Sequence, residues 1–225
     1  MGHKMEKGTG LSFRQKQFLE VVLQEREFFK QFYLSGGTAL SSWYLHHRES
    51  YDLDFFSDKP FDGEKITHWI KQNEEKLEYQ SLVVNDDFGF YTFIFRYKDN
   101  SRFKVDFNHY TSQRITNGMV WHGLEIDTMY EIAVNKMHII RTHPRERDYV
   151  DLYCILKKTN WSIYKLLTDA DRKFDSSTDW LQAAKHFLKA SEITDFPKML
   201  VPFNKKDMIR FYEHLAGRLK PKILK

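Results

Sequence analysis

The sequence predicts an α+β fold, in which a mixed β-sheet with flanking helices is followed by a C-terminal helical domain. Two patterns carry this prediction. Aromatic and β-branched residues form short alternating runs in the first half of the chain, and apolar residues recur at helical spacing in the second half. The chain has 225 residues, enough for two small domains. We place an α/β domain over 1–126 and a helical domain over 127–225.

The first part of the chain is predicted to alternate helices with short strands. Phe18, Val21 and Val22 recur at helical spacing, and the Gly36-Gly37 pair marks a turn from strand to helix. The predicted elements are a helix over 12–31, a strand over 32–34, a helix over 38–47, a strand over 51–56 and a helix over 63–76.

The sequence predicts strands in the middle of the chain and helices in the remainder. Predicted strands cover 80–84, 90–97 and 102–107, with a last extended piece over 119–126. Thr128-x-x-Glu131 has the form of a capping box at a helix start, and Pro144 separates that helix from the next. The predicted helices cover 128–141, 145–157, 162–173, 179–189 and 205–219.

Composition excludes several classes of protein. One cysteine rules out an intramolecular disulfide framework, and no run of apolar residues is long enough to span a membrane. The polar stretch 1–10 has no apolar core, so we predict no signal peptide and a cytoplasmic location. Residues 198–225 carry 8 basic and 2 acidic side chains. We interpret them as an RNA-binding helix over 205–219 with a flexible basic arm over 220–225, or as a merely solvated tail.

Three aspartates are the candidate metal ligands. Asp52 and Asp54 stand two residues apart in a predicted strand, so their side chains share a face, and Asp106 lies in another predicted strand. Such a set can hold Mg²⁺, two ions included, for phosphoryl transfer, and the Gly36-Gly37 turn can offer backbone N–H groups to phosphates. The alternative is that these acids only line the solvent face of a sheet.

Lys136 is a candidate because of where it falls on its helix. It lies in the same direction as Met129, Ile132 and Ile140, and a lysine in an apolar stripe is costly unless it reaches water, an acid or a phosphate. Snorkelling to solvent is the alternative. On this reasoning, replacing Lys136 would leave the melting temperature unchanged or raise it.

Four further polar residues flank these positions. Arg48 and Ser50 precede the acidic strand and can contact phosphate or fix the glycine turn. Asp148 and Asp151 open the helix after Pro144, where a carboxylate also suits the helix dipole. The sequence does not decide which of these two aspartates is functional.

Two segments resemble the AbiEii/AbiGii family of nucleotidyltransferase toxins, within the DNA-polymerase-β-like superfamily. They are Leu34-Ser-Gly-Gly-Thr-Ala-Leu40 and His47-Arg-x-Ser-x-Asp-Leu-Asp-Phe-Phe56. The resemblance continues in Glu131-Ile-Ala-x-Asn-Lys136 and Arg147-Asp-Tyr-Val-Asp-Leu152, so it covers about half the chain.

The resemblance implies a nucleotidyltransferase-type sheet and a Mg²⁺-dependent transfer of a nucleoside monophosphate from an NTP to an acceptor. It implies catalytic roles for Asp52, Asp54, Asp106, Lys136 and Asp151. It implies nucleotide binding by Gly36, Gly37, Thr38, Arg48, Ser50, Lys136 and Asp148. A toxin of this kind is expected to act on RNA, tRNA in particular, within a toxin–antitoxin or phage-defence pair, with a cognate antitoxin. The alternatives are a non-catalytic RNA- or protein-binding module on the same fold, and a metal-dependent phosphodiesterase.

Overall fold

The computed structural model describes residues 10–224, which divide into two compact units. The predictions for residues 1–9 and for Lys225 lie outside this range. The first unit contains Ser50–Gln113, Asn117–Thr128 and the chain up to Tyr44, and the second contains Leu45–Glu49, Arg114–Thr116 and the chain from Met129 onward. The predicted α+β fold class is confirmed.

A mixed β-sheet of seven strands, in the order β3-β4-β5-β2-β1-β7-β6, forms the centre of the first unit. The pair β5/β2 and the pair β1/β7 are parallel, and the other neighbours are antiparallel. The strands are β1 (Tyr33–Ser35), β2 (Leu53–Ser57), β3 (Ser81–Asp87), β4 (Phe90–Arg96), β5 (Arg102–His109), β6 (Met119–Trp121) and β7 (Leu124–Ile126).

One face of this sheet is aromatic and buried. Phe55 of β2 and Phe107 of β5 are register partners, are fully buried, and stack with ring centroids 4.8 Å apart. Phe18 from the first helix packs on this face against Phe55. Since successive side chains of a strand point to opposite faces, the residues on either side of Phe55 and Phe107 are directed away from this core.

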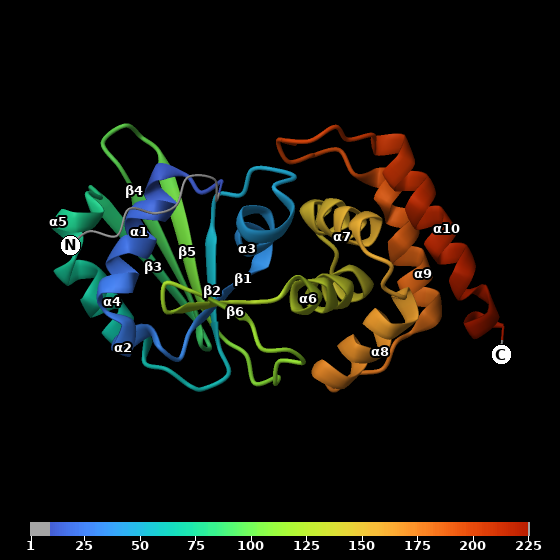
Figure 1. Cartoon of the computed structure of the whole chain (residues 1–225), viewed down its shortest axis with the longest axis horizontal. Helices are drawn as coiled ribbons and strands as arrows, with labels where there is room; N and C mark the ends of the chain where they lie inside the picture. Colours follow the sequence, from blue (N-terminus) through green and yellow to red (C-terminus); the bar gives the residue numbers. More distant parts are fainter. Residues whose placement is uncertain (1–9, 225) are drawn as a thin grey trace. The chain divides into compact units, whose positions relative to one another are not determined.

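Helices cover the aromatic face (Figure 1). They are α1 (Phe13–Gln24), α2 (Arg26–Phe29), α4 (Gly63–Gln72) and α5 (Glu74–Leu77). Two predicted helices are therefore each split. The first breaks at Glu25, which leaves helical geometry at φ −115° and ψ 47°, and the other at Asn73, at φ −103° and ψ 18°. On the chain after β1, α3 (Gly36–Leu40) continues into a π-helical turn, η1 (Ser41–Leu45).

The predicted extended piece over 119–126 is a hairpin instead of one strand. His122 and Gly123 join β6 to β7, and both have positive φ, 48° and 92°. Two such residues between short strands form the tight turn that matches the twist of a hairpin.

The second unit is helical. Its helices are α6 (Met129–Thr142), α7 (Glu146–Lys158), α8 (Ile163–Lys173), α9 (Trp180–Leu188), the 3₁₀ turn η2 (Lys189–Glu192) and α10 (Lys205–Ile223). Glu131 of α6 holds the segment 114–116, because its Oε2 accepts hydrogen bonds from the N–H groups of Ile115 (2.9 Å) and Thr116 (3.1 Å). Its other oxygen pairs with Lys173 of α8, and both side chains are buried.

The prediction of a flexible arm over 220–225 is wrong for residues 220–223. Helix α10 continues through Pro221 to Ile223. Leu219 is fully buried and anchors this last stretch of the helix. Within residues 10–224, no helix combines the length and the apolar character that crossing a membrane requires.

Candidate functional site

Two of the three predicted acids are register neighbours in the sheet. Asp54 of β2 pairs with Asp106 of the parallel strand β5. Both flank the buried phenylalanines of their strands, so their side chains lie on the face opposite the aromatic core. Asp52 precedes β2 by one residue and lies two residues before Asp54, so extended backbone directs both side chains to the same face. The sheet therefore presents all three carboxylates on one side.

Lys104 and Thr92 surround these acids. Lys104 Nζ lies 2.5 Å from Asp106 Oδ2 and 3.5 Å from Asp52 Oδ2. The hydroxyl of Thr92, on β4, donates to Asp106 Oδ1 at 2.8 Å. The side chains of Asp106 and Asp52 are 15% and 28% exposed, so this group is partly open to solvent.

Gly36 packs directly against Asp54. Its φ is +74°, a conformation that L residues rarely adopt, and a Cβ there would lie 3.0 Å from Asp54 Cγ and closer still to Oδ2. Ser35, just before it, is the register partner of Asp54 across β1 and β2. Because Gly36 has no side chain, the turn that contains it can pack directly against the Asp54 carboxylate.

Thr38 and Gln15 fix the chain that carries Ser50 and Asp52. The Thr38 hydroxyl forms hydrogen bonds with Ser50 Oγ (2.9 Å) and with the carbonyl oxygen of Asp52. The buried amide of Gln15 donates to the carbonyl oxygens of Ser50 (2.9 Å) and Asp52 (3.4 Å). Thr38 is fully buried, so its side chain is committed to these internal hydrogen bonds.

The donor chemistry of this face suits a magnesium ion. Mg²⁺ prefers carboxylate oxygens, and three carboxylates lie on one side of two neighbouring strands. Among residues 10–224, no three or more His, Cys, Asp or Glu side chains are grouped closely enough to hold a metal as they stand. The ammonium of Lys104 instead interacts with two of the acids. The assignment of a metal to Asp52, Asp54 and Asp106 stays a prediction.

The remaining predicted residues meet in the second unit, around Asp151. Arg48 makes a bidentate contact, with Nε donating to Asp151 Oδ1 (2.6 Å) and Nη2 to Oδ2 (2.8 Å). His47 Nε2 lies 2.9 Å from Oδ1, and Lys136 Nζ lies 2.8 Å from Oδ2. The side chain of Asp151 has no exposed surface. Its carboxylate is therefore fully engaged by three basic side chains.

Lys136 also contacts the second aspartate. Its Nζ donates to Asp148 Oδ1 at 2.5 Å, and Arg145 Nε donates to Asp148 Oδ2 at 2.9 Å. Sequence reasoning could not choose between Asp148 and Asp151, and the structure brings both to the same lysine. Because Lys136 balances two buried carboxylates, the structure leads to the opposite prediction, that its removal reduces stability.

Electrostatics favour the charged forms of Asp151, Lys136 and Asp148. Burial alone would raise the pKa of Asp151, but the positive charges of Lys136 and Arg48 outweigh burial and hold it well below its usual range. Burial likewise opposes the charged form of Lys136, and Asp151 and Asp148 raise its pKa above the ordinary value. The pKa of Asp148 is lowered, since Lys136 and Arg145 overcome its burial.

The structure adds three residues that sequence reasoning missed. Gln15 had a local signal, because Ser12-x-x-Gln15 is a capping box and Gln15 Oε1 accepts from the Ser12 N–H at 2.8 Å. Lys104 stands two residues before Asp106, which gives the two a common face. His47 begins a family-like segment, but the sequence did not indicate its partner Asp151, which lies 104 residues away.

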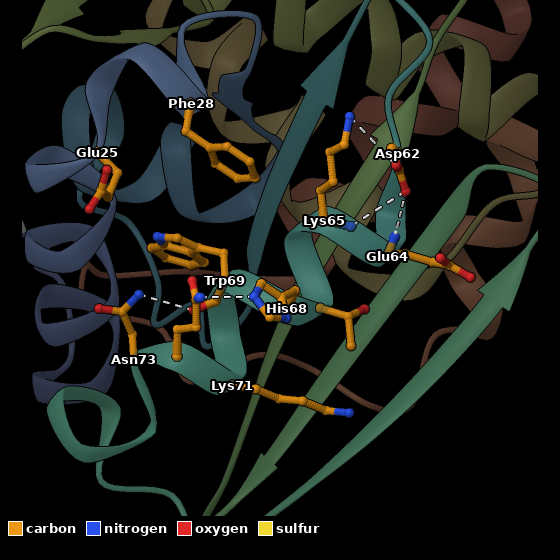
Figure 2. Close-up of a pocket in the computed structure, with 11 residues that line it drawn as sticks. Glu25, Phe28, Asp62, Glu64, Lys65, His68, Trp69, Lys71 and Asn73 are labelled. Carbon is orange, nitrogen blue, oxygen red and sulfur yellow. Dashed lines mark hydrogen bonds and ion pairs between the residues drawn. The ribbon is translucent and has the colours of Figure 1, made fainter.

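A groove beside α4, drawn in Figure 2, contains none of the predicted site residues. Several of its polar groups form local hydrogen bonds. Gln72 Nε2 lies 2.8 Å from His68 Nε2, the Asn73 amide donates to the carbonyl oxygen of Trp69, and Asp62 caps the helix. Helix α4 covers the aromatic face of the sheet, so this groove is not where the aspartates lie.

A mixed sheet with aspartates gathered on one face, and a glycine turn packed against one of them, defines the class of nucleotidyltransferases. Residues 17–217 match the sequence profile of the family described as "Nucleotidyl transferase AbiEii toxin, Type IV TA system". The chain belongs to this family.

The individual relatives compared below share less than 30% sequence identity with this chain. The uncharacterized protein aq_aa25 of Aquifex aeolicus (strain VF5) is 27% identical over 154 residues, which is 64% of this chain and 66% of that protein, just under two thirds of its length. The crystal structure of JHP933 from Helicobacter pylori matches with a TM-score of 0.55 at 18% identity, over 93% of this chain and 91% of the other. A candidate nucleotidyltransferase from H. pylori matches with a TM-score of 0.58 at 18% identity, over 95% and 97%. At this identity the two structures show a common fold.

Proposed function

We propose that this protein is a Mg²⁺-dependent nucleotidyltransferase that moves a nucleoside monophosphate from an NTP to a hydroxyl of an RNA acceptor, tRNA being the first candidate. Family membership supports the reaction class and a role as the toxin of a toxin–antitoxin pair, with an antitoxin as partner. The observation that carries the proposal is the register pairing of Asp54 with Asp106, with Gly36 packed against Asp54.

In the proposed reaction the acceptor oxygen forms a bond to the α-phosphorus of the NTP. The bond from that phosphorus to the oxygen bridging to the β-phosphate breaks, and pyrophosphate leaves with the electron pair. Asp52, Asp54 and Asp106 would hold Mg²⁺, which when bound neutralises charge on the phosphates. Asp106 is proposed either to take the hydroxyl proton itself or to be a metal ligand, in which case the proton passes to solvent water.

The backbone of Gly36, Gly37 and Thr38 is proposed to bind the triphosphate. Thr38 has a second task, since its side chain holds Asp52 through the carbonyl oxygen. Ser50 belongs to the same hydrogen-bonded group, with its hydroxyl on that of Thr38. The turn and the acidic strand are thus held by one set of bonds, which fixes the positions of ligands and phosphates together.

The second group of proposed functional residues consists of Lys136, Arg48, Asp148 and Asp151. Lys136 is 5% exposed and bonded to both carboxylates, so a contact with phosphate requires it to exchange one of them. We assign Asp151 a positioning role, because all of its contacts are internal. Through Arg48 and His47 it fixes the segment 45–49, which leads directly into Ser50.

The test is to incubate the protein with total RNA, Mg²⁺ and each α-³²P-labelled NTP in turn. We expect label in the RNA with one or more NTPs, and release of pyrophosphate in equal amount. Asp54→Asn should reduce incorporation by at least about 100-fold, because it removes a carboxylate from the reacting centre. Asp87→Asn is the matched control, since Asp87 is an exposed aspartate of the same sheet, on β3.

Three outcomes contradict all or part of the proposal. If no NTP labels any RNA in the presence of Mg²⁺ or Mn²⁺, the transfer reaction is wrong. If RNA is instead shortened and the loss depends on Asp54, the protein is a phosphodiesterase. Label on protein with none on RNA would refute the acceptor alone.

A further inference from the structure

Lys104 introduces a positive charge among the three candidate metal ligands. It lies on β5 two residues before Asp106, so both side chains project from the same face. Its ammonium is 2.5 Å from Asp106 Oδ2 and 3.5 Å from Asp52 Oδ2. These oxygens are also the ones that a divalent cation would use.

The contacts of Lys104 lie where solvent can reach them. The Lys104 side chain is 35% exposed, so water reaches the group and can replace a broken contact. Lys104 and a divalent cation are both attracted by the negative charge of these carboxylates.

We propose that Lys104 is a built-in counter-cation that stabilises the acidic site without nucleotide and competes with the divalent metal for the carboxylates of Asp52 and Asp106. The inference rests on the proposed function, because it concerns the metal of that reaction. It implies weak metal binding by the free protein. An NTP, whose phosphates add negative charge and offer Lys104 other partners, would strengthen metal binding, so that metal and nucleotide enter together.

The experiment measures Mn²⁺ binding to the full chain without nucleotide, by electron paramagnetic resonance of free Mn²⁺. Lys104→Met keeps most of the side-chain volume and removes the charge. We expect its Kd for Mn²⁺ to be about tenfold lower than that of the unmodified protein, because a charge within a few ångströms shifts such an equilibrium by a factor of ten or more. Added non-hydrolysable NTP analogue should tighten Mn²⁺ binding more in the unmodified protein than in Lys104→Met.

Three variants control this measurement. Lys104→Arg keeps the charge and should restore a Kd close to that of the unmodified protein. Arg102→Met removes an exposed positive charge from the same strand and face and should change the Kd less than twofold. Lys104→Gln is a second neutral variant, used if Lys104→Met does not fold. The melting temperature without metal should fall in the neutral variants and rise steeply with Mn²⁺, since a ligand that binds only the folded state stabilises it.

The outcomes separate this inference from the function on which it rests. Equal or weaker Mn²⁺ binding by both neutral variants, in a protein that transfers label to RNA, would overturn the role of Lys104 alone. If the unmodified protein and both neutral variants bind no Mn²⁺ and transfer no label, the inference and the proposed function fail together. Tighter binding in both neutral variants, with Arg102→Met unchanged, would support it.

Discussion

Replacing Asp151 by asparagine should lower the free energy of unfolding by about 3–5 kcal/mol. The variant keeps the size of the side chain but removes the negative charge that Arg48 and Lys136 share. Arg48 and Lys136 are 2% and 7% exposed in their side chains, so neither can turn to water without disrupting the packing around it. Losing one partner of a buried ion pair costs this much because the other charge is left uncompensated.

Urea unfolding followed by circular dichroism is the appropriate assay, because urea is uncharged and does not screen ion pairs. Asp207→Asn is the matched control in the same unit. Asp207 pairs with Arg210 at 2.7 Å, but their side chains are 49% and 71% exposed. An exposed pair contributes at most about 1 kcal/mol, so the two asparagine variants should differ severalfold in their effect.

A double variant tests whether the loss comes from unpaired charge. Arg48→Met combined with Asp151→Leu removes the bidentate pair and leaves Lys136 with Asp148. This protein should be more stable than Asp151→Asn, since apolar residues of similar volume tolerate burial better than a lone charge does. If Asp151→Asn costs less than about 1 kcal/mol, or the double variant is the less stable of the two, the cluster does not hold the unit as described.

The Asp151 carboxylate also determines in which direction the free energy of unfolding changes with pH. The pKa of Asp151 is held well below its usual range in the folded protein, whereas an unfolded aspartate has a pKa of about 3.9. Below that value the unfolded chain takes up a proton that the folded protein does not bind. The stabilisation is therefore complete above about pH 4 and is lost as the pH falls toward the folded pKa. Asp151→Asn should show a shallower loss of stability in this acid range.

Three further predictions concern single features. Gly36→Ala should cost about 1–2 kcal/mol of stability from its positive φ, and should lower transfer of label further than that because the new Cβ displaces the Asp54 carboxylate; unchanged transfer would contradict the packing. Lys136→Met should reduce the free energy of unfolding by about 1–3 kcal/mol, measured in urea, and a stabilised variant would show that its carboxylates gain nothing from it. Lys206→Glu with Arg210→Glu should flatten the dependence of log RNA affinity on log salt, at about 0.7 per lost phosphate contact, without changing NTP binding; an unchanged slope removes α10 from the RNA surface.

Features with a short sequence period were predictable. The alternation around Phe55 and Phe107 assigned Asp54 and Asp106 to one face, because the side chains of a strand repeat every two residues. The Gly36 turn was visible as a glycine pair before a helix. The register that makes Asp54 and Asp106 neighbours was not predictable, since it depends on how two strands 52 residues apart in sequence are paired.

Features created by distant partners could not be predicted. The contact between Arg48 and Asp151 joins positions 103 residues apart, and neither has a local pattern that names the other. The predicted end of α10 at residue 219 was also too early, because the helix continues through Pro221 to Ile223. A proline in the last turn removes only one backbone hydrogen bond, and the burial of Leu219 holds the helix there.

The ion pairs of Lys136 and of Lys104 differ in exposure to solvent. This difference indicates which of the two can exchange ions during a reaction. The side chains of Lys136 and Asp151 are 7% and 0% exposed, so Lys136 can exchange a carboxylate only for another negative group, such as the proposed phosphate, and not for water. Lys104 and Asp106 are 35% and 15% exposed, so water can take the place of either partner. A site that must release and rebind ions during each turnover needs the second environment. We therefore place the exchange of metal and nucleotide at the sheet, and assign the network around Asp151 to holding the segment 45–49 that leads into Ser50.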